Sequence, residues 1–427
     1  MSRSSYKWII LGISFMNIAA ANAIRFSFSI FFVAILEEFR WSRASIAGAF
    51  SLSALLLGIS SWFGGRLVDR FGTRKILIGG IIILSLSTIA SGRIQQVWHL
   101  YALSGVLVAI GIAGIGRVPH SVLLSNWFSR SRGTAVGIAF SGLGVGILII
   151  GPVSQLLISS FGWRIAYVIL GLMVLALLLP LSCMVRDRPN QEEGHSTRHS
   201  SNPHTEIKGE IRGLYGANDE EGDWTLGRSM RTLPFWAISL AFFILPIGIF
   251  PVMIHQVAYI IDQGHSRMLA ASIFGAIGFL SSAGRLIFGP LSDRIGREKA
   301  VTWSFACSIT GIVILLLLPS LKSVFWLYLY ALLFGAGFGA RGPIGAAMMA
   351  DMYQGRHFGD IYGFIHVGNG IGGALGPWLG GYLYDVTGSY KISFLICIPV
   401  LILACILFWM AGWPRRRKTK GQCWLWM

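Results

Sequence analysis

The sequence predicts an all-α membrane protein with twelve transmembrane helices, arranged as two parallel six-helix repeats. Three observations support this fold class: the composition, the length of the apolar runs and an internal repeat. Of 427 residues, 54% are hydrophobic and 12% are charged, and the mean hydropathy is +0.66, a balance that soluble chains do not show. Only helices or closed barrels satisfy their backbone groups in lipid, and these apolar runs are too long and too uniform for barrel strands.

Twelve apolar runs have about the twenty residues that a helix needs to cross a bilayer. The first run follows a short basic head, is too long for a removable secretory signal and has no cleavage site of small residues after it, so we expect it to remain as the first span. We expect the spans near 8–36, 44–62, 76–92, 98–126, 134–160, 164–185, 233–261, 268–291, 300–318, 324–351, 358–384 and 391–413.

Lys and Arg are distributed unequally between the two sides of this arrangement. The side of the termini holds 24 of them and the opposite side seven. Such a bias predicts that both termini are cytoplasmic, in a protein integral to the plasma (inner) membrane. The polar segment 186–231 separates the halves, so we expect an N-terminal bundle (1–185), a cytoplasmic linker (186–231), a C-terminal bundle (232–414) and a basic cytoplasmic tail (415–427).

An internal repeat relates the two halves at a constant shift of 224 residues. Trp41-Ser42-Arg43 aligns with His265-Ser266-Arg267, and Arg117 with Pro119 aligns with Arg341 and Pro343. Each repeat contains an even number of spans, so both enter the membrane in the same sense. In parallel repeats of this kind the central site lies at the midplane between the halves.

A glycine-rich charged loop occurs once in each repeat, at 65–75 and 289–299. The matching residues are Gly65, Leu67, Asp69, Arg70, Gly72, Arg74 and Lys75, and Gly289, Leu291, Asp293, Arg294, Gly296, Arg297 and Lys299. They resemble the signature G-x-L-a-D-R-x-G-R-[RK]-[RK] of the major facilitator superfamily, with departures at Thr73 and Glu298. The resemblance implies secondary active transport by alternating access. It also implies that these two loops act as conformational latches, in which Gly65 and Gly289 allow close helix approach.

A narrower resemblance concerns span one and its surroundings. Arg25 followed by Phe26 and Phe28, and the segments 39–44 and 126–133, are similar to the monocarboxylate-porter and oxalate/formate-antiporter branch. In that branch an arginine of span eight binds the substrate carboxylate, and Arg285 occupies the matching place. The functional lysine of the antiporter in span eleven is replaced by Asn369, which argues against dicarboxylate exchange.

Four arginines fall within the predicted spans, whereas none of the 18 acidic residues lies at mid-span. Each arginine would cost on the order of 3 kcal/mol if it faced lipid. Guanidinium charge in a cavity recruits anions and matches a carboxylate through two parallel hydrogen bonds. We therefore predict a small organic anion as substrate, most simply a monocarboxylate. The predicted substrate-binding residues, which we expect to line this cavity, are Arg285, Arg341, Arg117, Arg25, Asn369, His366, His120, Asn22 and Tyr330.

Two questions stay open at this level. The arginines have a structural alternative, hydrogen bonding to helix carbonyls opened by Pro119 or Pro343, or extension toward headgroups.

The coupling partner is a proton or a counter-anion. Because no mid-span carboxylate is available, histidine is the candidate for a proton, with a neutral hydrogen-bonded histidine as the simpler alternative.

Two other functions use the same fold. An exporter of amphipathic drugs or siderophores would need an apolar cavity, often with an acidic residue, and a non-transporting sensor would need an added soluble domain. The chain shows no Walker loop, zinc signature or triad spacing, so we expect no cofactor, no metal and no enzymatic activity. The expected partners are the solute and membrane lipid, without nucleic acid, and a monomer is expected.

Overall fold

The computed structural model describes residues 3–128, 132–187, 224–321, 323–353 and 358–419, and in these ranges the chain is helical without β-strands. The helices, in chain order, are α1 (Arg3–Phe39), α2 (Arg43–Phe71), α3 (Thr73–Ser91), α4 (Val97–Leu100), η1 (Tyr101–Leu107), α5 (Val108–Ile115), α6 (Arg117–Trp127), α7 (Arg132–Cys183), α9 (Leu226–Ser229), α10 (Leu233–Asp262), α11 (Arg267–Ile295), α12 (Arg297–Leu317), η2 (Leu318–Ser320), α13 (Phe325–Met352), α14 (Phe358–Thr387) and α15 (Tyr390–Thr419).

The predicted twelve spans are confirmed. Within the described residues, nine helical stretches are long and apolar enough to cross a membrane. One of them contains two spans, because the chain leaves helical geometry at Gly162 (φ 78°, ψ 157°) inside α7. The other two spans are α13 and α14, with 28 and 30 residues. Their mean hydropathy is lower because both are rich in glycine and α13 carries Arg341.

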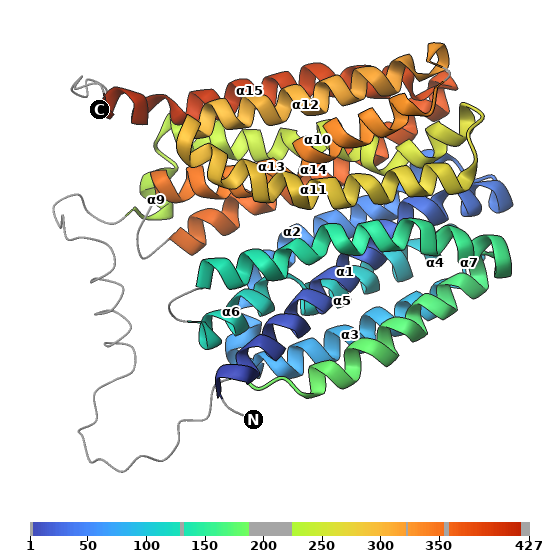
Figure 1. Cartoon of the computed structure of the whole chain (residues 1–427), viewed down its shortest axis with the longest axis horizontal. Coiled ribbons are helices and arrows are strands. Elements are labelled where there is room, and N and C mark those ends of the chain that lie inside the picture. The colour runs from blue at the N-terminus through green and yellow to red at the C-terminus, as the bar shows by residue number, and fades with distance from the viewer. Residues whose placement is uncertain (1–2, 129–131, 188–223, 322, 354–357, 420–427) are drawn as a thin grey trace.

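The helices form two bundles, α1 to α7 and α10 to α15, as the two repeats predict (Figure 1). α1 begins and α15 finishes at the same end of the molecule, which we call the terminal end; the opposite end is the distal end. Most of the predicted linker, 188–223, lies outside the described residues, as do 420–427 of the predicted tail. α15 continues to Thr419, so the first part of that tail is helical.

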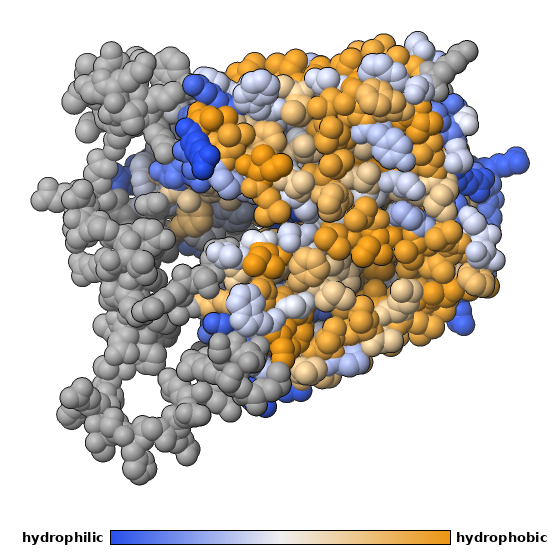
Figure 2. Space-filling model, viewed as in Figure 1, coloured by the Kyte–Doolittle hydropathy of each residue, from blue (hydrophilic) through white to orange (hydrophobic). Residues whose placement is uncertain are grey.

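The outer surface of the bundles is apolar, and hydrophilic residues gather toward the two ends (Figure 2). Large side chains such as Leu86, Ile149, Phe279 and Leu395 are each more than half exposed. Apolar side chains in such numbers on a surface match a hydrocarbon solvent and not water. The chain is therefore an integral membrane protein.

The two bundles contact each other mainly where α2 packs along α14 and α7 packs along α11. Glycines bring the backbones close in both contacts. A Cβ at Gly58 would lie 2.6 Å from the Cα atom of Gly370, and a Cβ at Gly144 would overlap Ser282. Ser282 Oγ also donates a hydrogen bond to the Ser141 carbonyl across α7 and α11, at 3.0 Å. Small residues thus allow the backbones of the two halves to approach closely.

Gly72 and Gly296 occupy equivalent turns at the terminal end, between α2 and α3 and between α11 and α12. Their φ, ψ angles are 79°, 152° and 94°, 147°, a region that only glycine adopts without strain. The N-terminus of α3 is further held by Asp187, whose Oδ1 accepts a hydrogen bond from the Arg74 N–H at 2.9 Å. The second glycine of each signature loop, Gly72 or Gly296, is therefore required by backbone geometry.

We predict that Gly296→Ala lowers the free energy of unfolding by about 1–3 kcal/mol, because alanine is strained at that φ and ψ. Gly79→Ala is the matched control: Gly79 lies inside α3 with no atom within 4 Å of an added Cβ, so alanine should be neutral or slightly stabilising there. Thermal unfolding of the purified protein in detergent measures both. Equal melting temperatures for the two variants would contradict the strain at Gly296.

Candidate functional site

A cavity of about 300 Å³ lies between the two bundles. α1, α2, α5, α6 and α7 line it from one half, and α10, α11, α13 and α14 from the other. All four arginines of the membrane interior line this one cavity: Arg25, Arg117, Arg285 and Arg341. The described lining residues include no Asp or Glu. The structure therefore collects positive charge from both repeats at one place.

Arg25 of α1 is surrounded by aromatic rings. Its Cζ lies 5.2 Å from the ring centre of Phe50, 5.7 Å from that of Phe26 and 6.0 Å from that of Phe250. Cation–π attraction of this kind holds a guanidinium without neutralising it. The Nε atom of Arg25 is buried and has no hydrogen-bond partner among the described residues. Arg25 thus keeps a donor that a bound anion is able to use.

Arg285 of α11 has the same property. Its Nη1 atom is buried and finds no hydrogen-bond partner in the part of the chain that the structure describes, although a buried polar group normally has one. Arg117 lines the same cavity as Arg285 and Arg25, and its positive charge repels both of them. An anion placed among them would relieve the repulsion and satisfy the free donors.

A helix break positions Arg117. Gly116 adopts an extended conformation (φ −86°, ψ −155°) between α5 and α6, so α6 begins inside the bundle at Arg117. No side chain caps this N-terminus, and Gly116, Arg117 and Val118 all line the cavity. Pro119 suits the first turn of a helix because it has no N–H to satisfy. The free N–H groups and the helix dipole add to the positive potential there.

Arg341, the repeat counterpart of Arg117, is held very differently. α13 is continuous, and Arg341 is 3% exposed. Its Nε donates to Ser304 Oγ at 3.2 Å, and its Nη2 donates to Ser308 Oγ. The counterparts of these serines, 224 residues earlier, are Gly80 and Leu84, which have no hydroxyl. One repeat therefore anchors its arginine, whereas the other leaves Arg117 exposed in the cavity.

Three of the predicted polar residues also line the cavity: His366, Asn369 and Asn22. His366 packs against Tyr362, with ring centres 4.3 Å apart, and its Nε2 has no hydrogen-bond partner. Asn369 Nδ2 donates to the Phe242 carbonyl at 3.2 Å. Asn22 Nδ2 donates to the carbonyl one turn earlier in α1. These side chains add neutral polar atoms to a wall that is otherwise basic and apolar.

The prediction that His120 and Tyr330 line the cavity is wrong. Both are 0% exposed and belong to the packed interior of their own half. His120 Nδ1 lies 3.1 Å from Ser14 Oγ, and Tyr330 Oη donates to Gln256 Oε1 at 2.5 Å. Polar side chains inside a bundle also satisfy one another between helices, and sequence position alone does not separate this role from cavity lining.

The two signature loops lie at the terminal end. Arg297 Nη1 pairs with Asp293 Oδ1 at 2.5 Å, and its Nε pairs with Asp351 Oδ2 at 3.3 Å. Arg294 lies beside this pair in the last turn of α11. Among the described residues, no atom lies within 4 Å of a Cβ added at Gly289, so close helix approach at this position stays a prediction.

In the first repeat, the Arg70 guanidinium lies 5.4 Å from the ring centre of Phe71, and the backbone of Arg74 binds Asp187. Gly65 and Asp69 lie outside the residues whose side chains are described. Asp187 was missed by sequence reasoning because it sits at the edge of the polar linker. Its only sequence signal is its negative charge, which is opposite to the charge of the loop 65–75 that it contacts.

A twelve-span bundle of two repeats with a cationic cavity between them is a membrane transporter. The sequence profile of the Major Facilitator Superfamily matches residues 10–341 and 323–422. The chain belongs to this superfamily.

Similar proteins agree with this assignment. The MFS-type transporter YcxA of Bacillus subtilis is 26% identical over 408 residues, which cover 94% of each chain. Monocarboxylate transporter 12 of Homo sapiens is 27% identical, covering 97% of this chain and 82% of that protein. Human monocarboxylate transporter 2 is 26% identical, covering 93% and 84%.

The fold also matches solved structures. A bacterial homologue of the human lysosomal transporter Spinster, solved in an inward-facing and unoccupied conformation, superposes with a TM-score of 0.69. That match has 17% sequence identity and covers 98% of this chain and 99% of that chain.

We predict that Ser308→Ala lowers the free energy of unfolding by about 1.5–3 kcal/mol, because it removes a hydrogen bond to a buried charged group. Ser87→Ala is the matched control, since the buried Ser87 hydroxyl bonds only to the Leu84 carbonyl of its own helix, a bond that contributes little. Thermal unfolding in detergent compares the two. If both variants melt alike, Arg341 is not anchored by Ser308.

Proposed function

We propose that the protein transports a small organic anion, a monocarboxylate, by alternating access, and that Arg285 binds the carboxylate. The observation that carries this proposal is the set of unpartnered buried guanidinium atoms, Nη1 of Arg285 and Nε of Arg25, in one cavity. The described lining offers them no carboxylate. A solute with negative charge completes the site, because a planar guanidinium binds a carboxylate through two parallel hydrogen bonds.

The walls of the cavity favour a single carboxylate with an apolar body. Phe26, Phe242, Phe250 and Phe338 line it together with aliphatic side chains. In span eleven, where the resemblance places a second functional cation in oxalate/formate antiporters, Asn369 donates to a backbone carbonyl instead. The relatives named monocarboxylate transporters also support this solute class.

The anion takes part in the transport cycle through its charge. Closing apolar walls around unpaired arginines is costly, because charges lose hydration in a low-dielectric space. A bound carboxylate cancels part of that charge and so lowers the free energy of the closed, occupied state relative to the closed, empty one. Binding and closure are thus coupled by electrostatics alone.

We infer that the terminal end faces the cytoplasm, following the excess of Lys and Arg in the loops at that end. The coupling partner is a proton or a counter-anion. Of the histidines that sequence reasoning singled out, His366 is the one that lines the cavity. It is therefore our candidate for a proton-binding residue, whereas anion exchange needs no titratable group.

We predict that Arg285→Gln and Arg285→Lys each reduce carboxylate uptake into proteoliposomes by at least about thirtyfold, because removing one partner of a desolvated charge pair costs about 2–5 kcal/mol. Lysine should not substitute, since it lacks the planar fork. Arg93→Gln is the control: this arginine is exposed at the distal end, and the variant should transport normally. Near-normal uptake by both Arg285 variants would refute the assignment.

A thermal-shift screen of the purified protein identifies the solute class. Small monocarboxylates should raise the melting temperature of the parent protein and not of Arg285→Gln. Stabilisation by amphipathic cations instead would favour an exporter of amphipathic compounds. Binding without counterflow of labelled monocarboxylate in proteoliposomes would favour a sensor.

A further inference from the structure

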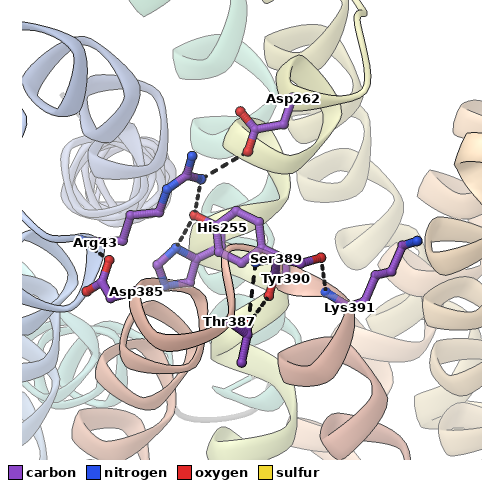
Figure 3. A network of polar contacts seen from close by, with 8 residues as sticks. All are labelled: Arg43, His255, Asp262, Asp385, Thr387, Ser389, Tyr390 and Lys391. Atoms are coloured by element: carbon purple, nitrogen blue, oxygen red, sulfur yellow. Dashed lines mark hydrogen bonds and ion pairs between the residues drawn. The ribbon is translucent and has the colours of Figure 1, made fainter.

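At the distal end, a carboxylate of one half caps a helix of the other half (Figure 3). Asp385, near the end of α14, accepts hydrogen bonds from the N–H groups of Arg43 and Ala44, both at 2.8 Å. These two residues begin α2, where backbone N–H groups have no partner within the helix. A carboxylate at this position is stabilised by hydrogen bonds and by the helix dipole together.

The Arg43 side chain crosses between the halves at the same point. Its Nη1 lies 3.1 Å from Asp262 Oδ2 at the end of α10, and it donates to Tyr390 Oη at 2.6 Å. Its guanidinium carbon lies 3.6 Å from the ring centre of Tyr384. The Arg43 side chain is 11% exposed and that of Asp262 is 37% exposed. Arg43 is therefore a largely desolvated cation with partners on three helices of the other half.

A buried histidine orients this cluster. His255 Nε2 lies 2.9 Å from the Pro377 carbonyl, and its Nδ1 lies 3.1 Å from Tyr390 Oη. A carbonyl only accepts, so Nε2 donates and Nδ1 accepts from the Tyr390 hydroxyl. Tyr390 is then free to accept from Arg43. The donors in this chain of hydrogen bonds are thus defined: Arg43 donates to Tyr390, Tyr390 donates to His255, and His255 donates to the Pro377 carbonyl.

The internal repeat provides a second, related contact. Arg267, the counterpart of Arg43, begins α11 and pairs with Glu37 at the end of α1 at 2.8 Å. Asp262 is the counterpart of Glu38, the neighbour of Glu37. In each half, an arginine begins the second long helix. In both cases its side chain reaches an acidic residue at the end of the first long helix of the other half. The second pair is open to water, with side chains 51% and 45% exposed.

We propose that these two contacts form the polar gate at the distal end, and that the cluster of Arg43, Asp262, Asp385 and Tyr390 contributes far more to its closure than the pair of Arg267 with Glu37. Breaking the cluster leaves the largely buried Arg43 cation without its partners, whereas a pair that is exposed on both sides contributes little because water solvates and screens it. The inference rests on the proposed alternating access, in which this end must open. It concerns the gate alone and does not depend on which solute is carried.

The test measures the distance between spin labels across the distal end by pulsed electron paramagnetic resonance. Labels on cysteines replacing the exposed Gln95 and Ser323, in an otherwise cysteine-free full-length chain in nanodiscs, report one half each. The parent should show mainly a short distance. Asp385→Asn and Arg43→Gln should each raise the ratio of long to short distances at least about tenfold. Glu37→Gln, the matched control at the exposed pair, should change it less than about twofold.

A charge exchange provides the second arm. Arg43→Asp should open the gate, and adding Asp262→Arg to it should restore the short distance. If the Arg43 variants do not fold, Tyr390→Phe, which removes only one hydroxyl, should still raise the fraction of the long distance. Unchanged distances in Asp385→Asn and Tyr390→Phe, or equal opening by Glu37→Gln, would overturn the proposal. Because no uptake is measured, failure of the monocarboxylate assignment leaves this result interpretable.

Discussion

The structure depends on one constraint: arginine side chains carry positive charge in the membrane interior, and no acidic side chain of the described lining neutralises it. Guanidinium groups at lipid depth are costly unless they face protein, water or an anion. Arg25, Arg117 and Arg285 meet around one cavity that holds no carboxylate among its described residues. The apolar surface, the glycine-rich contacts between halves and the helix break at Gly116 all serve to keep these charges together and away from lipid.

The two repeats began from the same motif and have diverged in chemistry. Arg117 and Arg341 are 224 residues apart, each two residues before a proline. Ser304 and Ser308 tie Arg341 to the wall, whereas the extended backbone at Gly116 presents Arg117 to the cavity. The distal end shows the same divergence, since Arg43 is largely buried and Arg267 is exposed. A symmetric scaffold thus carries asymmetric functions.

Most of the fold could be predicted from the sequence, because apolar length and the excess of Lys and Arg in one set of loops are properties of composition. The cavity was predicted in part: the four arginines, His366, Asn369 and Asn22 line it. His120 and Tyr330 could not be placed, because a polar residue in a span has the same sequence appearance whether it faces a cavity or a neighbouring helix. The pairing of Asp385 with the start of α2 joins residues more than 340 positions apart, and no local pattern signals it.

The contact between Gly58 and Gly370 bears on how such a molecule moves. Where two helices touch through bare backbone, no side chain is inserted into the opposing surface, and relative rotation requires no change of rotamer. The contact of α2 with α14 at these glycines therefore gives little steric resistance to rotation, whereas the contact of Gly144 with Ser282 also carries a hydrogen bond from Ser282 to the Ser141 carbonyl. Rotation of the halves about these glycines must then break the polar contacts at the distal end, such as the pair of Arg43 with Asp262. Once those end contacts are broken, the glycine contacts of α2 with α14 allow the two halves to rotate relative to each other.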